Sequence, residues 1–252
     1  MLVLYFSGTG NTKYIANKFA EKMNGKSYSI EEEVDFKEII LESEIITFCY
    51  PIYGSSVPLI MSDFVDKYKS YLNNKKLIIL STQMLFSGDG ARVFVDLLRG
   101  VEFEVIYAEH FNMPNNLPNL PVINVKNGDK LKKKVAKAEK KLSEVCDNIN
   151  AKIIKKRGFN KVSKFLGYNL QRKGFTKLEK KIKDDVKVND DCILCSACVK
   201  VCPKKNLFIN NNKINSKGDC TICNRCVNVC PKQAITVFYH NKVRVQYKGI
   251  RK

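Results

Sequence analysis

The stretch "YFSGTGNT", residues 5–12, decides the fold, because it places the end of an apolar strand directly before the start of a helix. Backbone N–H groups in such a turn, added to the positive end of the helix dipole, predict a binding site for a phosphate. The loop is neither a Walker A loop, since it lacks G-K-S/T, nor the G-x-G-x-x-G of dinucleotide binders. Its expected ligand residues are Ser7, Gly8, Thr9, Gly10, Asn11 and Thr12. The alternative is that Asn11 or Thr12 only caps the helix.

Short apolar runs alternate with helical patterns on either side of this loop. We expect strands at 2–6, 27–30, 44–49, 77–82 and 103–108, and helices near 12–23, 35–41, 58–71 and 89–99. Near-continuous Val, Ile and Leu in strands separated by helices predicts an α/β domain with a parallel sheet covered on both faces. A longer helix is expected over 129–156, with Asp129 as N-cap and Gly158 as terminator, because its apolar residues recur at intervals of four and three.

Eight of the ten cysteines lie between residues 192 and 230, too close together for a set of ordinary disulfides. They form the run C-x2-C-x2-C-x3-C-P twice, 28 residues apart, which is the pattern of bacterial two-cluster ferredoxins. In that pattern three cysteines bind one 4Fe-4S cluster and the fourth reaches the other. The expected ligands are Cys192, Cys195, Cys198 and Cys230 for one cluster, and Cys220, Cys223, Cys226 and Cys202 for the second. A zinc site is the alternative, although zinc modules usually separate their ligands into two pairs. Cys49 and Cys146 are expected in the apolar core.

Charge and length limit the class of protein. The chain has 252 residues, and its N-terminus lacks a basic segment followed by a cleavage site, so we expect a cytoplasmic protein without a membrane span. Residues 126–187 carry 21 Lys or Arg against 7 Asp or Glu, and so hold most of the net charge of +19. Such a segment can attract nucleic acid, an anionic membrane or an acidic protein, or it can be a solvated helix face. No nucleic-acid recognition motif accompanies it, so nucleic acid is not expected as a partner.

The loop "SGTGNT" resembles the phosphate loop of the flavodoxin family, T/S-x-T-G-x-T, and the resemblance extends over residues 1 to about 156. It implies a doubly wound five-stranded parallel sheet of order 2-1-3-4-5, with FMN at the switch point beyond the strand ends. The family's ring-binding loops have counterparts in two segments. The flavin contacts that the resemblance implies are Pro51, Ile52, Tyr53, Gly54, Thr82, Gln83, Met84, Ser87, Gly88 and Asp89. Tyr53 is expected to stack on the ring.

Two alternatives stand beside these assignments. Tyr50 and Tyr53 could merely cover the end of the sheet, and Asp89 is equally suited to cap the next helix. The sequence also departs from the family, because it has no Trp and is basic, whereas carrier flavodoxins are usually acidic. Residues 110–121, rich in Pro and Asn, are expected to be irregular and to lie beside the flavin or over it.

The whole chain resembles the EFR1-type ferredoxin family, in which a flavodoxin-like part precedes a two-cluster ferredoxin part. The expected division is 1–157 for the FMN domain, 158–185 for a basic connector with one or two short helices, 186–240 for a small α+β two-cluster domain and 241–252 for a basic tail. The resemblance implies electron transfer between two 4Fe-4S clusters and FMN, and on to a partner oxidoreductase or carrier with an acidic docking surface. The alternative is an FMN-dependent reductase of a small molecule, fed by the clusters. Exposed clusters suggest an anaerobic cytosol, and His110 and His240 are expected to be structural or exposed.

Overall fold

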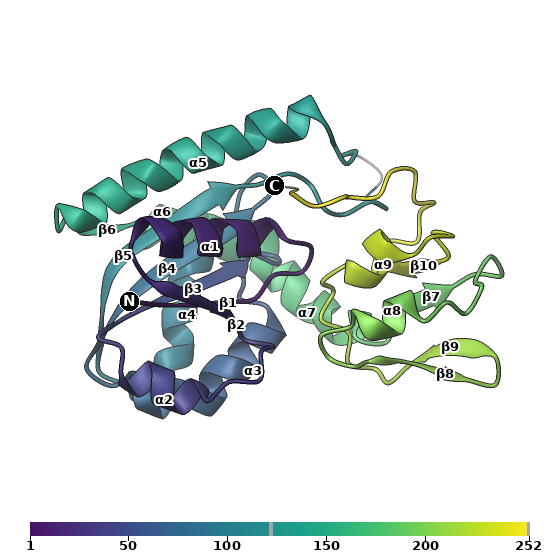
Figure 1. Cartoon of the computed structure of the whole chain (residues 1–252), viewed down its shortest axis with the longest axis horizontal. Helices are drawn as coiled ribbons and strands as arrows, with labels where there is room; N and C mark the ends of the chain where they lie inside the picture. Colours follow the sequence, from purple (N-terminus) through teal and green to yellow (C-terminus); the bar gives the residue numbers. More distant parts are fainter. Residues whose placement is uncertain (121–122, 251–252) are drawn as a thin grey trace.

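The N-terminal part is built on a six-stranded parallel sheet (Figure 1). The computed structural model describes residues 1–120 and 123–250. Strand order in the sheet is β2-β1-β3-β4-β5-β6. The strands are β1 (Leu2–Tyr5), β2 (Lys26–Ser29), β3 (Ile45–Pro51), β4 (Lys75–Gln83), β5 (Phe103–Asn112) and β6 (Lys155–Lys156). The prediction of an α/β fold with order 2-1-3-4-5 is therefore confirmed for the first five strands, and the prediction of five strands in all is wrong.

Helices cover both faces of the sheet and bury its apolar side chains (Figure 1). On one face lie α1 (Asn11–Lys22) and α5 (Asp129–Asn150), with Phe19 and Leu142 fully buried against the sheet. On the other face lie α2 (Phe36–Leu41), α3 (Leu59–Tyr68) and α4 (Gly90–Val95), and short 3-10 segments η1 (Lys69–Leu72) and η2 (Asp96–Leu98) extend the last two. Cys49 of β3 and Cys146 of α5 are buried in the core between the sheet and the helices α1 and α5, as expected for plain core residues.

The sixth strand arises because α5 ends earlier than the sequence pattern predicts. The helix begins at Asp129 with Gly128 as its N-cap residue, and it ends at Asn150 rather than near Gly158. Residues Lys155–Lys156 then pair with Tyr107 and Ala108 at the open edge of the sheet. Ile153, which continues the apolar stripe in sequence, is exposed. The apolar periodicity therefore predicted a helix end at residue 156, about one and a half turns beyond the observed end at Asn150.

The connector is almost entirely helical. It comprises α6 (Lys161–Leu166), a π-helical segment η3 (Gly167–Arg172) and α7 (Lys173–Ile182), in one unbroken run. Asn160 caps its start, with its side chain accepting a hydrogen bond from the Ser163 amide. A π-segment widens the helix locally, and such segments are frequent at functional sites. The run leads from the edge of the sheet to the C-terminal part (Figure 1).

The C-terminal part is a small α+β unit with its own core. Its elements are β7 (Val186–Val188), α8 (Ala197–Lys200), β8 (Leu207–Asn210), β9 (Lys213–Ser216), α9 (Arg225–Val229) and β10 (Ile235–Val237). Strands β7 and β10 pair antiparallel, as do β8 and β9. The cysteines line this core together with Val227, Ile235 and Val237. Across the described ranges 1–120 and 123–250, none of the helices combines the length and apolar character that a membrane span requires.

Candidate functional site

A cavity of about 580 Å³ lies beyond the carboxyl ends of β1, β3 and β4, and we call it the central cavity. This volume is in the range of small-molecule and cofactor sites. Twelve of the residues that the sequence assigns to FMN line it, namely Ser7, Gly8, Thr9, Asn11, Thr12, Pro51, Ile52, Tyr53, Gly54, Thr82, Gln83 and Met84. Gly10, Ser87, Gly88 and Asp89 do not line it.

The start of α1 faces the central cavity with its backbone donors. Gly10 precedes the helix at φ 103°, a left-handed conformation that favours glycine, and its amide donates to Ser7 Oγ at 3.1 Å. Among the described residues no side chain caps α1, so its first N–H groups remain available to a ligand. An uncapped helix start at a cavity is suited to a phosphate.

Asn11 has a structural role that the sequence does not reveal. Its Nδ2 donates to the Pro114 carbonyl at 2.9 Å, and its Oδ1 accepts from the Tyr247 hydroxyl at 2.5 Å. Thr12 similarly shares a hydrogen bond of 2.7 Å with Thr82, joining the start of α1 to the end of β4. The side chains of Asn11 and Thr12 therefore hold the cavity walls together, and neither caps α1.

Gly8 marks the place where the two halves of the chain meet. A Cβ atom on this residue would lie 2.6 Å from the Cys223 carbonyl oxygen and 3.3 Å from the Tyr53 hydroxyl. The sequence assigned Gly8 to close approach of an anion, whereas here the loop backbone is approached by a cysteine-bearing segment of the C-terminal part.

Replacing Gly8 with alanine is expected to lower the free energy of unfolding by on the order of 1–3 kcal/mol, because the new methyl group overpacks this contact. Chemical denaturation of the full chain measures the change. Gly174→Ala is the matched control, since a Cβ atom there meets nothing within 4 Å and the residue lies in a helix. Equal stabilities for Gly8→Ala and the parent protein would contradict the contact.

Tyr50 and Tyr53 have different roles. Tyr50 is fully buried and donates a hydrogen bond from its hydroxyl to the Gly90 carbonyl at 3.0 Å, so it covers the end of the sheet. Tyr53 lines the central cavity and lies close to the Cys223 thiol. Burial, with a smaller contribution from Cys223, raises the pKa of Tyr53 well above its usual value, so its hydroxyl is neutral.

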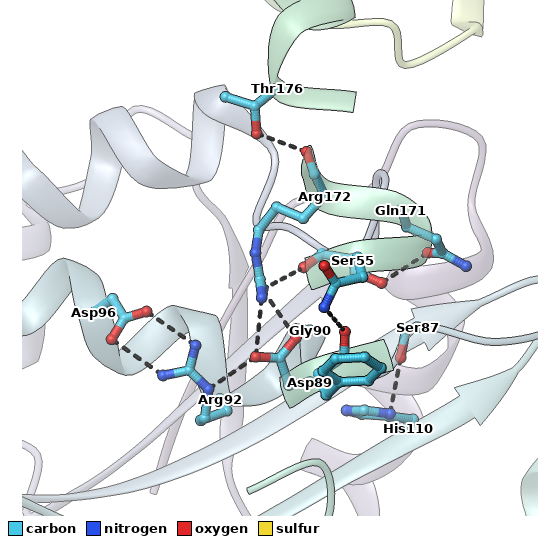
Figure 2. Close-up of polar contacts among 12 residues, drawn as sticks. Ser55, Ser87, Asp89, Gly90, Arg92, Asp96, His110, Gln171, Arg172 and Thr176 are labelled. Carbon is cyan, nitrogen blue, oxygen red and sulfur yellow. Dashed lines mark hydrogen bonds and ion pairs between the residues drawn. The ribbon is translucent and has the colours of Figure 1, made fainter. Parts of the chain in front are cut away.

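Gly88 and Asp89 contact the connector, whereas Ser87 bonds to His110 on β5, and none of the three lines the cavity. Figure 2 shows the contacts of Ser87 and Asp89. Asp89 is fully buried, and its carboxylate accepts from Arg92 Nε at 2.9 Å and from Arg172 Nη1 and Nη2 at 2.9 and 3.1 Å. Gly88 packs on Gly167, with only 2.4 Å between its would-be Cβ and the Gly167 Cα. The buried ion pairs fix the π-helical segment to the loop after β4, and no side-chain hydrogen bond from Asp89 caps α4 in the described structure.

His110 lies behind the same loop and is buried, so of the two alternatives expected for it, structural or exposed, it is not the exposed one. Its Nδ1 shares a hydrogen bond of 2.9 Å with Ser87 Oγ, and its Nε2 has no hydrogen-bond partner among the described residues (Figure 2). Burial, with a smaller contribution from Arg157, lowers the pKa of His110 to about 4. Glu109 and Asp89 oppose this shift, and Lys141 adds to it.

This buried imidazole predicts a loss of stability in acid. Below the ordinary histidine pKa of about 6.5 the unfolded chain binds a proton that the folded chain excludes until pH 4, so stability falls by on the order of 3 kcal/mol across that window. Denaturation of the parent protein and of His110→Gln at pH 7, 5.5 and 4.5 measures this. We expect a smaller fall in the variant, and identical pH slopes would exclude the role of His110.

The connector and residues 113–120 complete the walls of the central cavity, and the sequence did not identify the connector as part of it. Gln171, Phe175 and Leu178 line the cavity from the connector. Ser55 donates to Gln171 Oε1 at 2.7 Å, and the Phe175 ring lies over Gly54. The remaining lining residues are Leu85, Phe86, Met113, Pro114, Asn115, Asn116, Leu117, Leu120, Ile222, Asn224, Phe238 and Tyr239.

Residues 113–120 lie beside the cavity, as expected for the stretch 110–121, although residues 110–112 extend β5 and Pro121 is outside the described residues. The Met113 amide donates to the Gln83 carbonyl at 2.7 Å, and Asn116 Nδ2 donates to Thr9 Oγ1 at 2.7 Å. Asn228 of α9 donates to the Asn116 carbonyl at 2.9 Å. This segment therefore bridges the phosphate loop and the C-terminal part.

The residues of the central cavity fit a flavin nucleotide. Its walls combine an uncapped helix start with apolar and aromatic side chains. The side-chain oxygens Gln83 Oε1 and Asn224 Oδ1 are buried and have no hydrogen-bond partner within the described part of the chain. Buried acceptors of this kind are costly unless a donor reaches them, and a polar ring edge would supply one.

The eight cysteines of the repeat gather around two smaller cavities. Cavity I is lined by Cys192, Cys195, Cys198 and Cys230, and cavity II by Cys202, Cys220, Cys223 and Cys226. Each cavity thus receives three cysteines from one run and one from the other. Over residues 1–120 and 123–250 no group of three or more His, Cys, Asp or Glu side chains meets the criteria for a site holding a single metal ion.

The two runs also repeat their backbone conformation. Left-handed φ values recur 28 residues apart at Leu194 and Ile222, at Ser196 and Asn224, and at Lys205 and Gln233. Amides donate to sulfur in both runs, from Asn206 to Cys202 Sγ and from Ala234 to Cys230 Sγ, each at 3.3 Å. Non-glycine residues in this conformation are strained and cluster at ligand sites. Each run therefore wraps its cavity with the same local geometry.

The cysteine side chains suit iron–sulfur clusters in chemistry as well as position. Burial raises the pKa of Cys220 to about 11 and that of Cys223 to about 12, so both stay protonated at neutral pH without a cation. Iron is bound by the thiolate form, so cluster assembly would release these protons. Val188, Ile235 and Val237 contribute apolar walls.

Cavity II adjoins the central cavity, whereas cavity I shares no described lining residue with the central cavity. Asn224 lines both the central cavity and cavity II. Arg225, between two cysteines of cavity II, donates to the Gly8 carbonyl at 2.9 Å and to the Ser7 carbonyl at 2.7 Å, and pairs with Glu31. Cavity I includes Cys195, which is exposed, and Ile193, which is 57% exposed.

The C-terminal tail, for which the sequence offered no role, ties the two halves together. Tyr247 is buried, and its backbone amide donates to Asn228 Oδ1 of α9 at 2.7 Å. Gln246 Nε2 donates to the carbonyls of Val227 and Cys230. Since the Tyr247 hydroxyl reaches Asn11, the tail links α9 to the phosphate loop. Residues 251–252 lie outside the described part.

Comparison with known proteins supports both halves. A family model for the flavodoxin domain matches residues 2–147, and one for a 4Fe-4S dicluster domain matches residues 184–231. No curated protein matches the chain. The flavodoxin domain implies FMN as a cofactor, and the dicluster domain implies iron–sulfur clusters.

Several solved structures resemble the N-terminal part. Two-electron reduced flavodoxin of Megasphaera elsdenii is 23% identical, covering 47% of this chain and 91% of that chain, with a TM-score of 0.40. The Trp repressor binding protein of Bacillus subtilis is 14% identical over 59% of this chain and 96% of that chain, with a TM-score of 0.43. A flavoprotein of Lactobacillus acidophilus, solved in complex with FMN, is 14% identical over 43% of this chain and 91% of that chain, with a TM-score of 0.36.

The flavodoxin match covers more than half of the chain, and the dicluster match begins at the end of the connector. The protein therefore belongs to the flavodoxin domain family and carries a 4Fe-4S dicluster domain behind its flavodoxin domain.

Proposed function

We propose that this protein passes electrons between two 4Fe-4S clusters and FMN held in one chain, and on to a partner oxidoreductase or carrier. A flavin exchanges electrons singly or in pairs and each cluster exchanges one, so the cofactors supply the redox chemistry and the protein positions and insulates them. The coarse function, an electron-transfer protein with flavin and iron–sulfur cofactors, follows from the two matched domains. The order of the sites and the identity of the ligands are our proposal.

The observation that carries this proposal is the shared wall between the central cavity and cavity II. Asn224 belongs to both, and the Cys223 backbone touches the phosphate loop at Gly8. We assign Cys202, Cys220, Cys223 and Cys226 to a cluster next to the flavin, and Cys192, Cys195, Cys198 and Cys230 to an outer cluster. The exposure of Cys195 and Ile193 favours cavity I as a contact point for an outside redox protein.

The chain's own residues would hold FMN in a defined way. The uncapped start of α1 and the loop Ser7–Gly10 would bind the phosphate, while 51–54 and 82–84 would border the ring. Phe175 and Leu178 from the connector, with Phe238 and Tyr239 from the C-terminal part, would exclude water from it. Ser87, Gly88 and Asp89 do not line the central cavity and are not included among these ring contacts.

Cofactor analysis of anaerobically purified protein tests the proposal. We expect about eight iron atoms, as many sulfides and one FMN per chain, with an EPR signal from reduced 4Fe-4S clusters. After one cofactor is reduced by a rapid light-driven donor, stopped-flow absorbance should show electrons redistributing between iron–sulfur and flavin bands within the same molecule. Zinc in place of iron, or redistribution that depends on protein concentration, would refute it.

A second candidate function is reduction of a small molecule at the flavin. It is favoured by one observation, that residues 113–120 form an apolar and amide-bearing wall of the central cavity as they would over a substrate. Turnover of a panel of small oxidants by chemically reduced protein separates the two. Multiple turnovers with one compound support the reductase, whereas a single exchange per chain supports the carrier.

The proposed division of the chain follows the same assignment. Residues 1–157 form the FMN domain, 158–185 the connector, 186–240 the cluster domain and 241–252 the tail. The finer resemblance to EFR1-type ferredoxins remains a prediction. The connector lines the central cavity, and Tyr247 of the tail bonds to Asn11. We therefore propose that both segments act as parts of the flavin site.

A further inference from the structure

We propose that an exposed apolar face of the connector is the docking surface for an acidic redox protein that exchanges electrons at the central cavity. The surface, called here the connector patch, consists of Leu85, Phe86, Val162, Phe165, Tyr168 and Leu170. This inference rests on the proposed electron-transfer function and adds the place and the chemistry of a partner.

The connector patch is unusual in its exposure. Leu170 is 69% exposed, Val162 68% and Phe165 66%, although leucine, valine and phenylalanine are among the residues most often buried. They lie on consecutive turns of α6 and η3, and η3 is joined to Phe86 by the hydrogen bond from Gln171 to the Phe86 carbonyl. Contiguous exposed apolar side chains on a water-soluble surface mark interaction sites.

The patch is continuous with the wall of the central cavity. Leu85 and Phe86 line that cavity and are also exposed. Gln171 of η3 donates from Nε2 to the Phe86 carbonyl at 3.3 Å and lines the cavity too. A protein seated on the patch would therefore stand directly over the edge of the flavin site.

The helix that presents the patch is held firmly from behind. Arg172 pairs with the buried Asp89, and Ser55 donates to Gln171 (Figure 2). Gly167 also packs on Gly88. These contacts use the inner face of the helix and leave Phe165 and Leu170 facing outward. A preorganised apolar face loses less conformational entropy on binding than a mobile loop does.

The charges around the patch select an acidic partner. Residues 158–178 contain five Lys or Arg and no Asp or Glu. Arg172 is engaged by Asp89, whereas Lys161, Lys164, Lys173 and Lys177 are exposed and have no acidic partner among the described residues. A basic rim around an apolar centre is complementary to an acidic protein surface with a small apolar contact, and it steers encounter at low salt.

An anionic membrane would also be attracted by this charge, and the position of the patch argues for a protein instead. Only a partner that carries its own redox centre gains from lying over the central cavity, which the patch borders at Leu85 and Phe86. We therefore commit to an acidic redox protein, with vesicle binding as the competing outcome.

Binding of a purified acidic two-cluster ferredoxin to the full, cofactor-loaded protein tests the proposal. Two double variants are compared with the parent protein, Lys161→Glu with Lys164→Glu and Phe165→Ser with Leu170→Ser. Titration calorimetry at low salt should show that each double variant binds the ferredoxin at least about tenfold more weakly, a loss of about 1.4 kcal/mol in binding free energy. Stopped-flow electron exchange between the ferredoxin and the flavin should slow in parallel. The control variants are Lys26→Glu and Leu41→Ser, exposed residues on β2 and α2 outside the patch, which should leave both readouts unchanged.

Three outcomes would overturn the docking surface. The first is that the parent protein does not bind the ferredoxin, and the second is that the patch variants bind it as tightly as the control variants do. The third is that the parent protein binds vesicles of phosphatidylserine and phosphatidylcholine, and that the patch variants lose vesicle binding while they keep ferredoxin binding. Cofactor content and light-driven redistribution within one molecule are measured on the same samples. Their persistence would show that the docking idea alone has failed, and their loss in the parent protein would show that the proposed function has failed.

Discussion

Replacing Cys202 with serine is expected to remove about half of the iron, from about eight to about four atoms per chain, and to remove it from cavity II. Cys202 belongs to the first cysteine run in sequence, yet it lines the cavity of Cys220, Cys223 and Cys226. Serine oxygen is a poor substitute for a thiolate on iron, so three ligands should be insufficient to retain the cluster. Because this cavity adjoins the central cavity, light-driven exchange with the flavin should also fall sharply.

Iron and sulfide analysis with EPR measures this result. Cys146→Ala is the matched control, because Cys146 is a buried residue of α5 and lines neither cysteine cavity. It should retain all its iron. Cys230→Ser is the reciprocal variant and should remove the outer cluster while the inner one still exchanges electrons with the flavin. If Cys202→Ser removes the outer cluster instead, the ligand assignment is wrong.

Replacing Arg225 with methionine is expected to weaken FMN binding about tenfold or more and to slow electron exchange between cavity II and the flavin. Arg225 donates to the Ser7 and Gly8 carbonyls of the phosphate loop and forms a partly exposed ion pair with Glu31. Removing the guanidinium leaves these acceptors without their donor, at about 1–3 kcal/mol for each buried group. A loop released in this way should present its amides less well to the phosphate.

Fluorescence titration with FMN and stopped-flow absorbance measure the two effects, and iron content checks that both clusters remain. Arg225→Lys should restore part of the affinity, since lysine keeps the charge but cannot reach both carbonyls and Glu31 with a planar fork. Arg244→Met is the control, because Arg244 is exposed in the tail. Unchanged FMN affinity in Arg225→Met would show that the phosphate loop does not depend on the C-terminal part.

Local patterns predicted most of the fold. The alternation of apolar strands and helices placed β1 to β5 and α1 to α4 to within a few residues, because each pattern repeats within one element. The apolar stripe of α5 misled the prediction of its end, since periodicity continues through Ile153 although the chain leaves the helix at Asn150. Pairing with β5 decides the fate of Lys155–Lys156, and no local signal reports on it.

The candidate site was predictable where a motif lies within one loop. The cavity collects twelve of the sixteen residues assigned to FMN because they follow the strand ends of a parallel sheet, where ligands of open α/β sheets sit. Gly88 and Asp89 do not line the cavity and instead contact Gly167 and Arg172, which lie more than seventy residues away in the chain, so no local pattern reports on these contacts. Asn11 does line the cavity, but its bond to Tyr247 was not predictable from a local pattern, since the two residues are 236 positions apart.

By itself the sequence determined an α/β domain with a phosphate loop and a doubled cysteine run, since spacing and periodicity are properties of short segments. Tertiary structure alone decided that Cys223 and Arg225 touch the phosphate loop, and that cavity II rather than cavity I adjoins the central cavity. It also decided that the connector lines the central cavity and that the tail is bonded to Asn11. These contacts join segments up to 236 positions apart, and they depend on how the two modules pack rather than on any pattern within either one.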